Sequence, residues 1–170
     1  MESLRQVINA AIKMEKDGID FYRKAADKSS HPFGKEMFLS FMKDEERHLN
    51  AFKETLTNLG FSDFEKYFDK TPREEIKTVF NQIRNKIKKK VAASPDELEV
   101  LKIGMKMEDE SVHFYQNWLG ETSDERAEKL LERLVLEEKE HYKILENTYS
   151  LLKDSGKWFL WEEKALINGG

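Results

Sequence analysis

The stretch KMEKDGIDFY covers residues 13–22, and a second stretch, KMEDESVHFY, covers residues 106–115. The two stretches carry the same residue at five of their ten positions (Lys, Met, Glu, Phe and Tyr), at an offset of 93 residues. The same offset relates two further pairs of identical residues, Glu45 with Glu138 and His48 with His141. Because one offset holds without a gap over separate segments, the chain is predicted to contain a duplicated helical hairpin.

Apolar residues recur at steps of three and four along four long segments, as the buried face of an amphipathic helix requires. These segments predict helices over about residues 3–28, 34–59, 94–119 and 123–152. Pro32 separates the first two helices, because proline disfavours helical angles in the residue before it. That residue, His31, is expected to be structural or merely exposed. A connector over residues 61–94, with a shorter helix from Thr71 to about Lys90, is long enough to run the length of the bundle.

Composition agrees with a helical protein of one domain. Among 170 residues only 3 are proline and 8 are glycine, which leaves few of the turns that a sheet-rich fold needs. The predicted fold class is all-α, a four-helix bundle made of two helical hairpins joined by a long crossover that contains a short helix. Residues 1–154 are expected to form this bundle, and residues 155–170 an aromatic C-terminal tail. The apolar run from Lys157 to Trp161 is expected to dock on the bundle or on the second subunit of a homodimer.

Charge and cysteine content exclude several classes of function. The 29 basic and 33 acidic side chains give a net charge of −4, which argues against general binding of nucleic acid. The chain has no cysteine, which excludes disulfides, thiol catalysis, zinc–thiolate sites and iron–sulfur clusters. The first residues lack a secretory signal, and no apolar stretch is long enough to span a membrane, so we expect a soluble, cytoplasmic protein.

Four glutamates lie on the predicted buried faces of the helices, among apolar residues. They are Glu15, Glu45, Glu108 and Glu138. An unpaired buried carboxylate costs several kcal/mol, and four of them in one core would also repel one another. A positive charge is therefore expected between them.

Each predicted hairpin also carries a Glu-x-x-His pattern in its second helix, where residues three apart lie on one face. Glu45 pairs in this way with His48, and Glu138 with His141. Four carboxylates and two imidazoles predict a cage for two cations, and this donor set suits iron or manganese. The alternative is a purely structural polar core that binds no metal.

Other residues near the cage need separate interpretation. Glu110 and His113 form a third Glu-x-x-His pattern, but it is rejected as a metal site because both residues lie on a different helix face from Glu108. Tyr22 and Tyr115 occupy equivalent places on the buried faces. Their hydroxyls are expected either to hydrogen-bond to the glutamates of the cage or to pack as ordinary core aromatics.

These residues resemble the ferritin-like superfamily, and rubrerythrins most closely, over the four helices from about residue 3 to residue 152. The resemblance implies a di-iron centre, with manganese or zinc as other metals for the site, whose ligands would be Glu15, Glu45, His48, Glu108, Glu138 and His141. Residues 44–48 also resemble the Asp-Glu-x-Arg-His motif of bacterial di-iron oxygenases. That similarity implies that Asp44 hydrogen-bonds to His141 and that Glu137 hydrogen-bonds to His48.

Two features differ from the usual rubrerythrin pattern. Rubrerythrins usually carry a rubredoxin-like module that holds one iron with four cysteines, and this chain has no cysteine. They also tend to carry a further glutamate three residues after the third-helix ligand, where this chain has Ser111. The resemblance therefore implies a separate electron donor, such as a rubredoxin-like protein.

The resemblance favours a di-iron oxidoreductase that reduces hydrogen peroxide or dioxygen, as in the response to oxidative stress. No catalytic residue is expected beyond the metal centre itself. Two alternatives stay open. Ferritin-like iron oxidation and storage would need a shell of many subunits, whereas a metal-stabilised bundle would serve as a scaffold without turnover.

Overall fold

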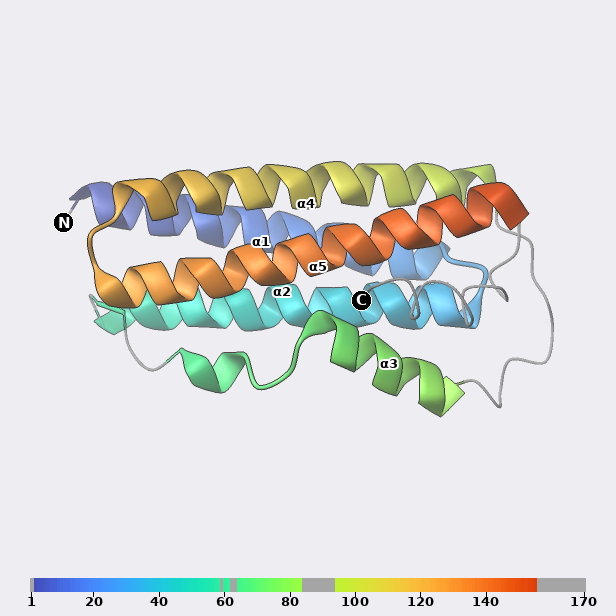
Figure 1. The fold of residues 1–170 in the computed structure, drawn as a ribbon, viewed down its shortest axis with the longest axis horizontal. Coiled ribbons are helices and arrows are strands. Elements are labelled where there is room, and N and C mark those ends of the chain that lie inside the picture. The colour runs from blue at the N-terminus through green and yellow to red at the C-terminus, as the bar shows by residue number, and fades with distance from the viewer. Residues whose placement is uncertain (1, 59, 62–63, 84–93, 156–170) are drawn as a thin grey trace.

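The computed structural model describes residues 2–58, 60–61, 64–83 and 94–155. The described residues form helices and no strand, so the predicted all-α bundle of two hairpins and a crossover is confirmed (Figure 1). The four long helices are α1 (Glu2–Lys28), α2 (Pro32–Asn58), α4 (Pro95–Glu121) and α5 (Glu125–Ser155). The crossover contains a 3-10 helix, η1 (Glu65–Tyr67), and a short α-helix, α3 (Pro72–Ile83).

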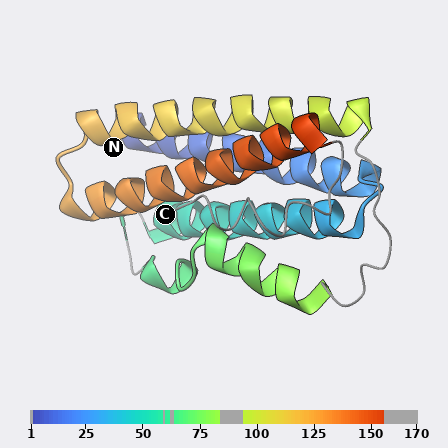
Figure 2. The same cartoon turned by 45° about the vertical axis from the view of Figure 1, so that its right-hand side comes forward.

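The helices pack as two hairpins. Helix α1 contacts α2, helix α4 contacts α5, and α1 also contacts α4. The described part of the crossover lies along the outside of the bundle, with η1 toward the end where α2 stops and α3 extending toward the end where α4 starts (Figure 1). Helix α3 contacts α2 and α5, and both views place it away from α4 (Figure 1 and Figure 2).

Helix α2 begins at Pro32, two residues earlier than predicted. Proline suits the first position of a helix, because the N–H group that it lacks would have no partner inside the helix. His31 caps this start, since the backbone N–H of Phe33 donates to its Nδ1 atom at 3.1 Å and that of Lys35 to its carbonyl oxygen at 3.0 Å. His31 is only 1% exposed, so it is structural and the expectation that it is merely exposed is wrong.

Side-chain caps also fix the starts of the last two helices. Ser94 and Glu97 form a capping box at the start of α4, with Pro95 in the first turn. Asp124 accepts hydrogen bonds from the backbone N–H groups of Arg126 and Ala127, so α5 begins slightly later than the expected Ser123.

Two apolar clusters fill the bundle, one on each side of the buried glutamates. On α1, Ile8 belongs to one cluster and Tyr22 to the other, with Glu15 between them. Similarly, Phe41 and Phe52 of α2 belong to different clusters and lie on either side of Glu45 along the chain. The same order holds on α4 and α5, so each long helix carries its buried glutamate between two apolar stretches.

Some expectations concern residues outside those described. These are the docking of the aromatic tail and the end of the predicted crossover helix, from Arg84 to about Lys90. Among the described residues, no helix combines the length and the apolar character needed to cross a membrane.

Candidate metal centre

The six predicted ligands come from all four long helices and meet in the middle of the bundle. None of them is more than 5% exposed, and both histidines are completely buried. They divide into two groups, in each of which one nitrogen or oxygen atom per residue lies within 4.8 Å of all the others.

The first group consists of Glu15, Glu45, His48 and Glu138. The Nδ1 atom of His48 lies 3.3 Å from Oε2 of Glu15 and 3.3 Å from Oε1 of Glu138. One imidazole nitrogen therefore faces carboxylates from both halves of the repeat.

The second group consists of Glu45, Glu108, Glu138 and His141. The Nδ1 atom of His141 lies 3.4 Å from Oε1 of both Glu45 and Glu108, and 3.2 Å from Oε2 of Glu138. Glu45 and Glu138 belong to both groups. The geometry thus provides two adjoining cation positions that share two carboxylates.

The Nε2 atom of each histidine, which faces away from the centre, forms a hydrogen bond with a carboxylate from the other hairpin. His48 donates from Nε2 to Glu137 at 3.0 Å, and His141 donates from Nε2 to Asp44 at 2.9 Å. These are the crossed pairs that the resemblance implies. Such bonds fix the tautomer and the orientation of each ring, so that Nδ1 points into the centre.

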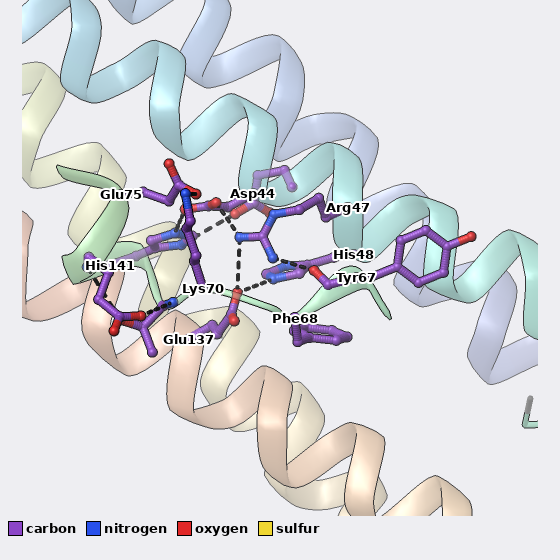
Figure 3. Close-up of polar contacts among 12 residues, drawn as sticks. Asp44, Arg47, His48, Tyr67, Phe68, Lys70, Glu75, Glu137 and His141 are labelled. Carbon is purple, nitrogen blue, oxygen red and sulfur yellow. Dashed lines mark hydrogen bonds and ion pairs between the residues drawn. The ribbon is translucent and has the colours of Figure 1, made fainter. Parts of the chain in front are cut away.

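Arg47 connects these two outer carboxylates. Figure 3 shows its guanidinium between Asp44, with which it forms a close ion pair, and Glu137, 3.5 Å away. Arg47 also donates to the backbone carbonyl oxygen of Tyr67 in the crossover. Burial opposes ionisation of Asp44, but its hydrogen bond to His141 and the charge of Arg47 hold the Asp44 pKa below its ordinary value.

Arg133 and Phe68 complete this side of the centre, and sequence analysis gave neither a role there. Arg133 lies 3.3 Å from Glu137 and donates to the carbonyl oxygen of Phe68 at 3.4 Å. The Phe68 ring stacks on His48 with 5.7 Å between ring centroids (Figure 3). The position of Arg133 one turn before Glu137 is a signal that could have indicated it, whereas no periodic pattern brings Phe68 to the site.

Each buried tyrosine donates to a glutamate of the opposite half. Tyr22 donates to Glu108, and Tyr115 donates to Glu15. Burial, followed by the charge of the bonded glutamate, raises the pKa of both hydroxyls well above the ordinary value. Both tyrosines therefore stay protonated as donors, which is the first of the two roles expected for them.

The electrostatics of the centre without a metal ion show a shortage of positive charge. Burial and then the charge of Glu138 raise the pKa of Glu108 to about 8, and burial with the same neighbour raises that of Glu45 well above its ordinary value. Burial disfavours charged imidazole, yet the surrounding carboxylates raise the pKa of His48 and His141 well above the ordinary value. These shifts favour proton binding to the carboxylates and imidazoles of the metal-free centre.

Unpartnered atoms indicate that the residues fit a metal. Among the described residues, four buried atoms of the first group form no hydrogen bond: Glu15 Oε2, Glu45 Oε1, His48 Nδ1 and Glu138 Oε1. Buried polar atoms are rarely left without a partner unless a ligand or ion provides one. Carboxylate oxygens with one imidazole per position suit iron and manganese.

The rejected pattern lies outside this centre. The side chains of Glu110 and His113 are 64% and 67% exposed. His113 approaches Asp109, and Glu110 approaches Lys106, both on the surface of α4. Neither residue reaches the buried glutamates.

Comparison with known proteins agrees with the geometry. The family model for rubrerythrin matches residues 6–149, which include all six predicted ligands. No curated protein and no solved structure matches the chain. Since the match covers most of the chain and all four long helices, this protein is a member of the rubrerythrin family.

Proposed function

We propose that this protein holds two iron ions in the centre and uses them to reduce hydrogen peroxide or dioxygen. The observation that supports this function best is the pair of adjoining ligand groups that share Glu45 and Glu138. Shared carboxylates hold two metal ions next to each other, which suits a small oxidant that takes up two electrons at once.

Reduction of hydrogen peroxide to water, or of dioxygen to hydrogen peroxide, requires two electrons and two protons. Hydrogen peroxide takes up two of each to become two water molecules, and two iron ions when bound supply one electron each. The residues would divide into Glu15 and His48 at one position, Glu108 and His141 at the other, and Glu45 and Glu138 at both.

The residues around the centre hold its ligands in place. Tyr22 and Tyr115 each fix one carboxylate by a hydrogen bond, and Asp44 and Glu137 orient the two imidazoles. The apolar clusters on both sides keep bulk water away, which strengthens every electrostatic interaction inside.

The electrons that reduce the oxidised iron again must come from outside the centre. The sequence has no cysteine, so this chain cannot build the four-cysteine iron site that usually serves this purpose in rubrerythrins. A separate reductant, such as a rubredoxin-like protein, would restore the reduced state.

Anaerobic titration with ferrous ion followed by rapid mixing tests the function. We expect two iron ions per chain and fast oxidation, seen as a rise in near-ultraviolet absorbance, with hydrogen peroxide or with air. The faster oxidant identifies the substrate. Binding of fewer than two ions, or bound iron that neither oxidant changes, would contradict the proposal and favour a structural role for the bundle.

A further inference from the structure

Gly18 lies in the middle of α1, directly against the carboxylate of Glu45. A Cβ atom placed on Gly18 would lie 2.9 Å from Oε2 of Glu45 and 3.3 Å from its Cδ and Cγ atoms. Real Cβ atoms essentially never approach another atom this closely, so any side chain at this position would displace the carboxylate. The other oxygen of Glu45, Oε1, lies 3.4 Å from Nδ1 of His141.

A buried position inside a helix does not by itself favour glycine. Glycine inside a helix is less favourable than alanine, because it gains more backbone freedom in the unfolded chain. Gly104, in the interior of α4, shows the ordinary case: its added Cβ would meet Cδ1 of Leu145, the end of a flexible apolar side chain, at 3.1 Å. At Gly18 the neighbour is a buried carboxylate instead.

The internal repeat shows that this glycine is not a requirement of the hairpin. The offset of 93 residues pairs Gly18 with Ser111, which carries a side chain. The two halves of the centre therefore differ at this position. The residue without a side chain is the one on α1, where Glu45 lies against the helix.

We propose that Gly18 is a positioning residue for the metal centre, because its missing side chain leaves the space that the Glu45 carboxylate occupies. The inference rests on one part of the proposed function, namely that Glu45 is a ligand at both cation positions. A methyl group at residue 18 would push Oε2 away, and Oε1 would move with it relative to His141. Both ligand groups would then lose their geometry.

Stability of the metal-free protein gives the first test. The single variants Gly18→Ala and Glu45→Ala and the double variant form a cycle, measured by thermal melting. We expect Gly18→Ala to raise the melting temperature more in the Glu45→Ala background than in the wild-type background. If Gly18→Ala does not fold by itself, Glu45→Ala should restore a cooperative transition. Equal shifts in both backgrounds, or no such restoration, would overturn the proposal.

Titration with Mn²⁺ gives the second test, with Gly104→Ala as the matched control. We expect Gly18→Ala to bind Mn²⁺ roughly 10- to 100-fold more weakly, as is typical when support for a ligand is lost. Gly104→Ala should bind Mn²⁺ like the wild type, and the shorter side chain in Gly18→Ala/Glu45→Asp should recover part of the affinity. Wild-type affinity in Gly18→Ala would overturn the proposal.

The two tests separate this inference from the proposed function. Neither uses an oxidant, so failure of peroxide or dioxygen reduction leaves both results interpretable. If the wild type bound no metal, the proposed function would fail, while the melting cycle would still decide whether Gly18 makes room for Glu45.

Discussion

Glu45 and Glu138 are the two carboxylates that the ligand groups share. Glu45 belongs to both ligand groups, whereas His141 belongs to one. We expect Glu45→Ala to lower iron binding from two ions per chain to none, and His141→Ala to remove at least the ion at its own position. Metal analysis after anaerobic loading and gel filtration measures both. Glu110→Ala changes an exposed residue of the same charge and should keep two ions per chain.

Protonation of Glu108 predicts how the stability of the metal-free protein depends on pH. Its pKa is about 8 in the folded protein, above the ordinary value of 4.5. Between pH 4.5 and about 8, the folded state therefore binds more protons than the unfolded state. Stability from this group is therefore present at low pH and is lost as pH rises through about 8. The raised pKa values of His48 and His141 act in the same direction.

Urea denaturation of the metal-free protein from about pH 6 to about pH 9 measures this dependence. The free energy of unfolding should fall over the interval. Glu108→Gln keeps an acceptor for Tyr22 but does not titrate, so the fall should be smaller in that variant. A fall of the same size in the variant would show that Glu108 is not its source.

At the scale of residues, the sequence and the resemblance predicted the residues that meet in the centre and the carboxylates that hydrogen-bond to its histidines, but they gave no role to Phe68, Arg133 or Gly18. A glutamate among apolar residues on one helix face is predicted to be buried, and the constant offset pairs it with an equivalent glutamate in the other half. Glu15 and Glu138 could therefore be predicted before the tertiary structure was known. The role of Phe68 depends on how the crossover lies against α2 and α5, which no local period encodes. Gly18 has no side chain and so adds nothing to a hydrophobic pattern. Its role follows only from the short distance between a Cβ atom added at this position and Glu45.

At the scale of elements, the crossover is part of the centre as well as a connection. Arg47 and Arg133 bond to its backbone at Tyr67 and Phe68, and both also approach Glu137. The position of the crossover and the orientation of the imidazole of His48 are thus held by the same two arginines.

Truncation of Phe68 tests this arrangement. Phe68 is 9% exposed and stacks on His48, so Phe68→Ala should lower the free energy of unfolding by about 3 kcal/mol and weaken metal binding. Chemical denaturation and Mn²⁺ titration measure the two effects. Tyr67→Phe removes only a hydrogen bond to Glu54 and should cost less than about 1 kcal/mol, with unchanged metal affinity. Unchanged metal affinity in Phe68→Ala would show that the crossover does not support the centre.

Helix boundaries were predictable where local chemistry sets them. Ser94 and Glu97 cap α4 through side chains that lie close together in the sequence, and the start of that helix was predicted correctly. The start of α2 was predicted too late, because the sequence pattern does not show that the His31 side chain turns back to cap the helix after Pro32.

At the scale of the whole molecule, assembly distinguishes the proposed function from iron storage. A storage protein needs a closed shell of many subunits, whereas the proposed oxidoreductase is expected to be a homodimer. Light scattering coupled to gel filtration measures the mass directly. A mass of about two chains would support the proposal, and a large shell would favour storage.

The two hairpins are joined through the centre, so metal binding should stabilise the molecule as a whole. Tyr22 and Tyr115 bond across the halves, as do the two histidines. A metal that binds only the folded state adds about 2.7 kcal/mol at 100 times its dissociation constant. For a chain of this size we expect the melting temperature to rise by roughly 5–10 °C.

Calorimetry with Mn²⁺ and then with a chelator measures this rise and its reversal. Glu45→Ala serves as the control, because it removes a carboxylate from both ligand groups. Without metal, this variant should melt above the wild type, since one buried and unpartnered carboxylate oxygen is gone. Addition of Mn²⁺ should not change the melting temperature of this variant. The order of stability between variant and wild type should therefore reverse when Mn²⁺ is added, and a purely structural polar core would show no such reversal.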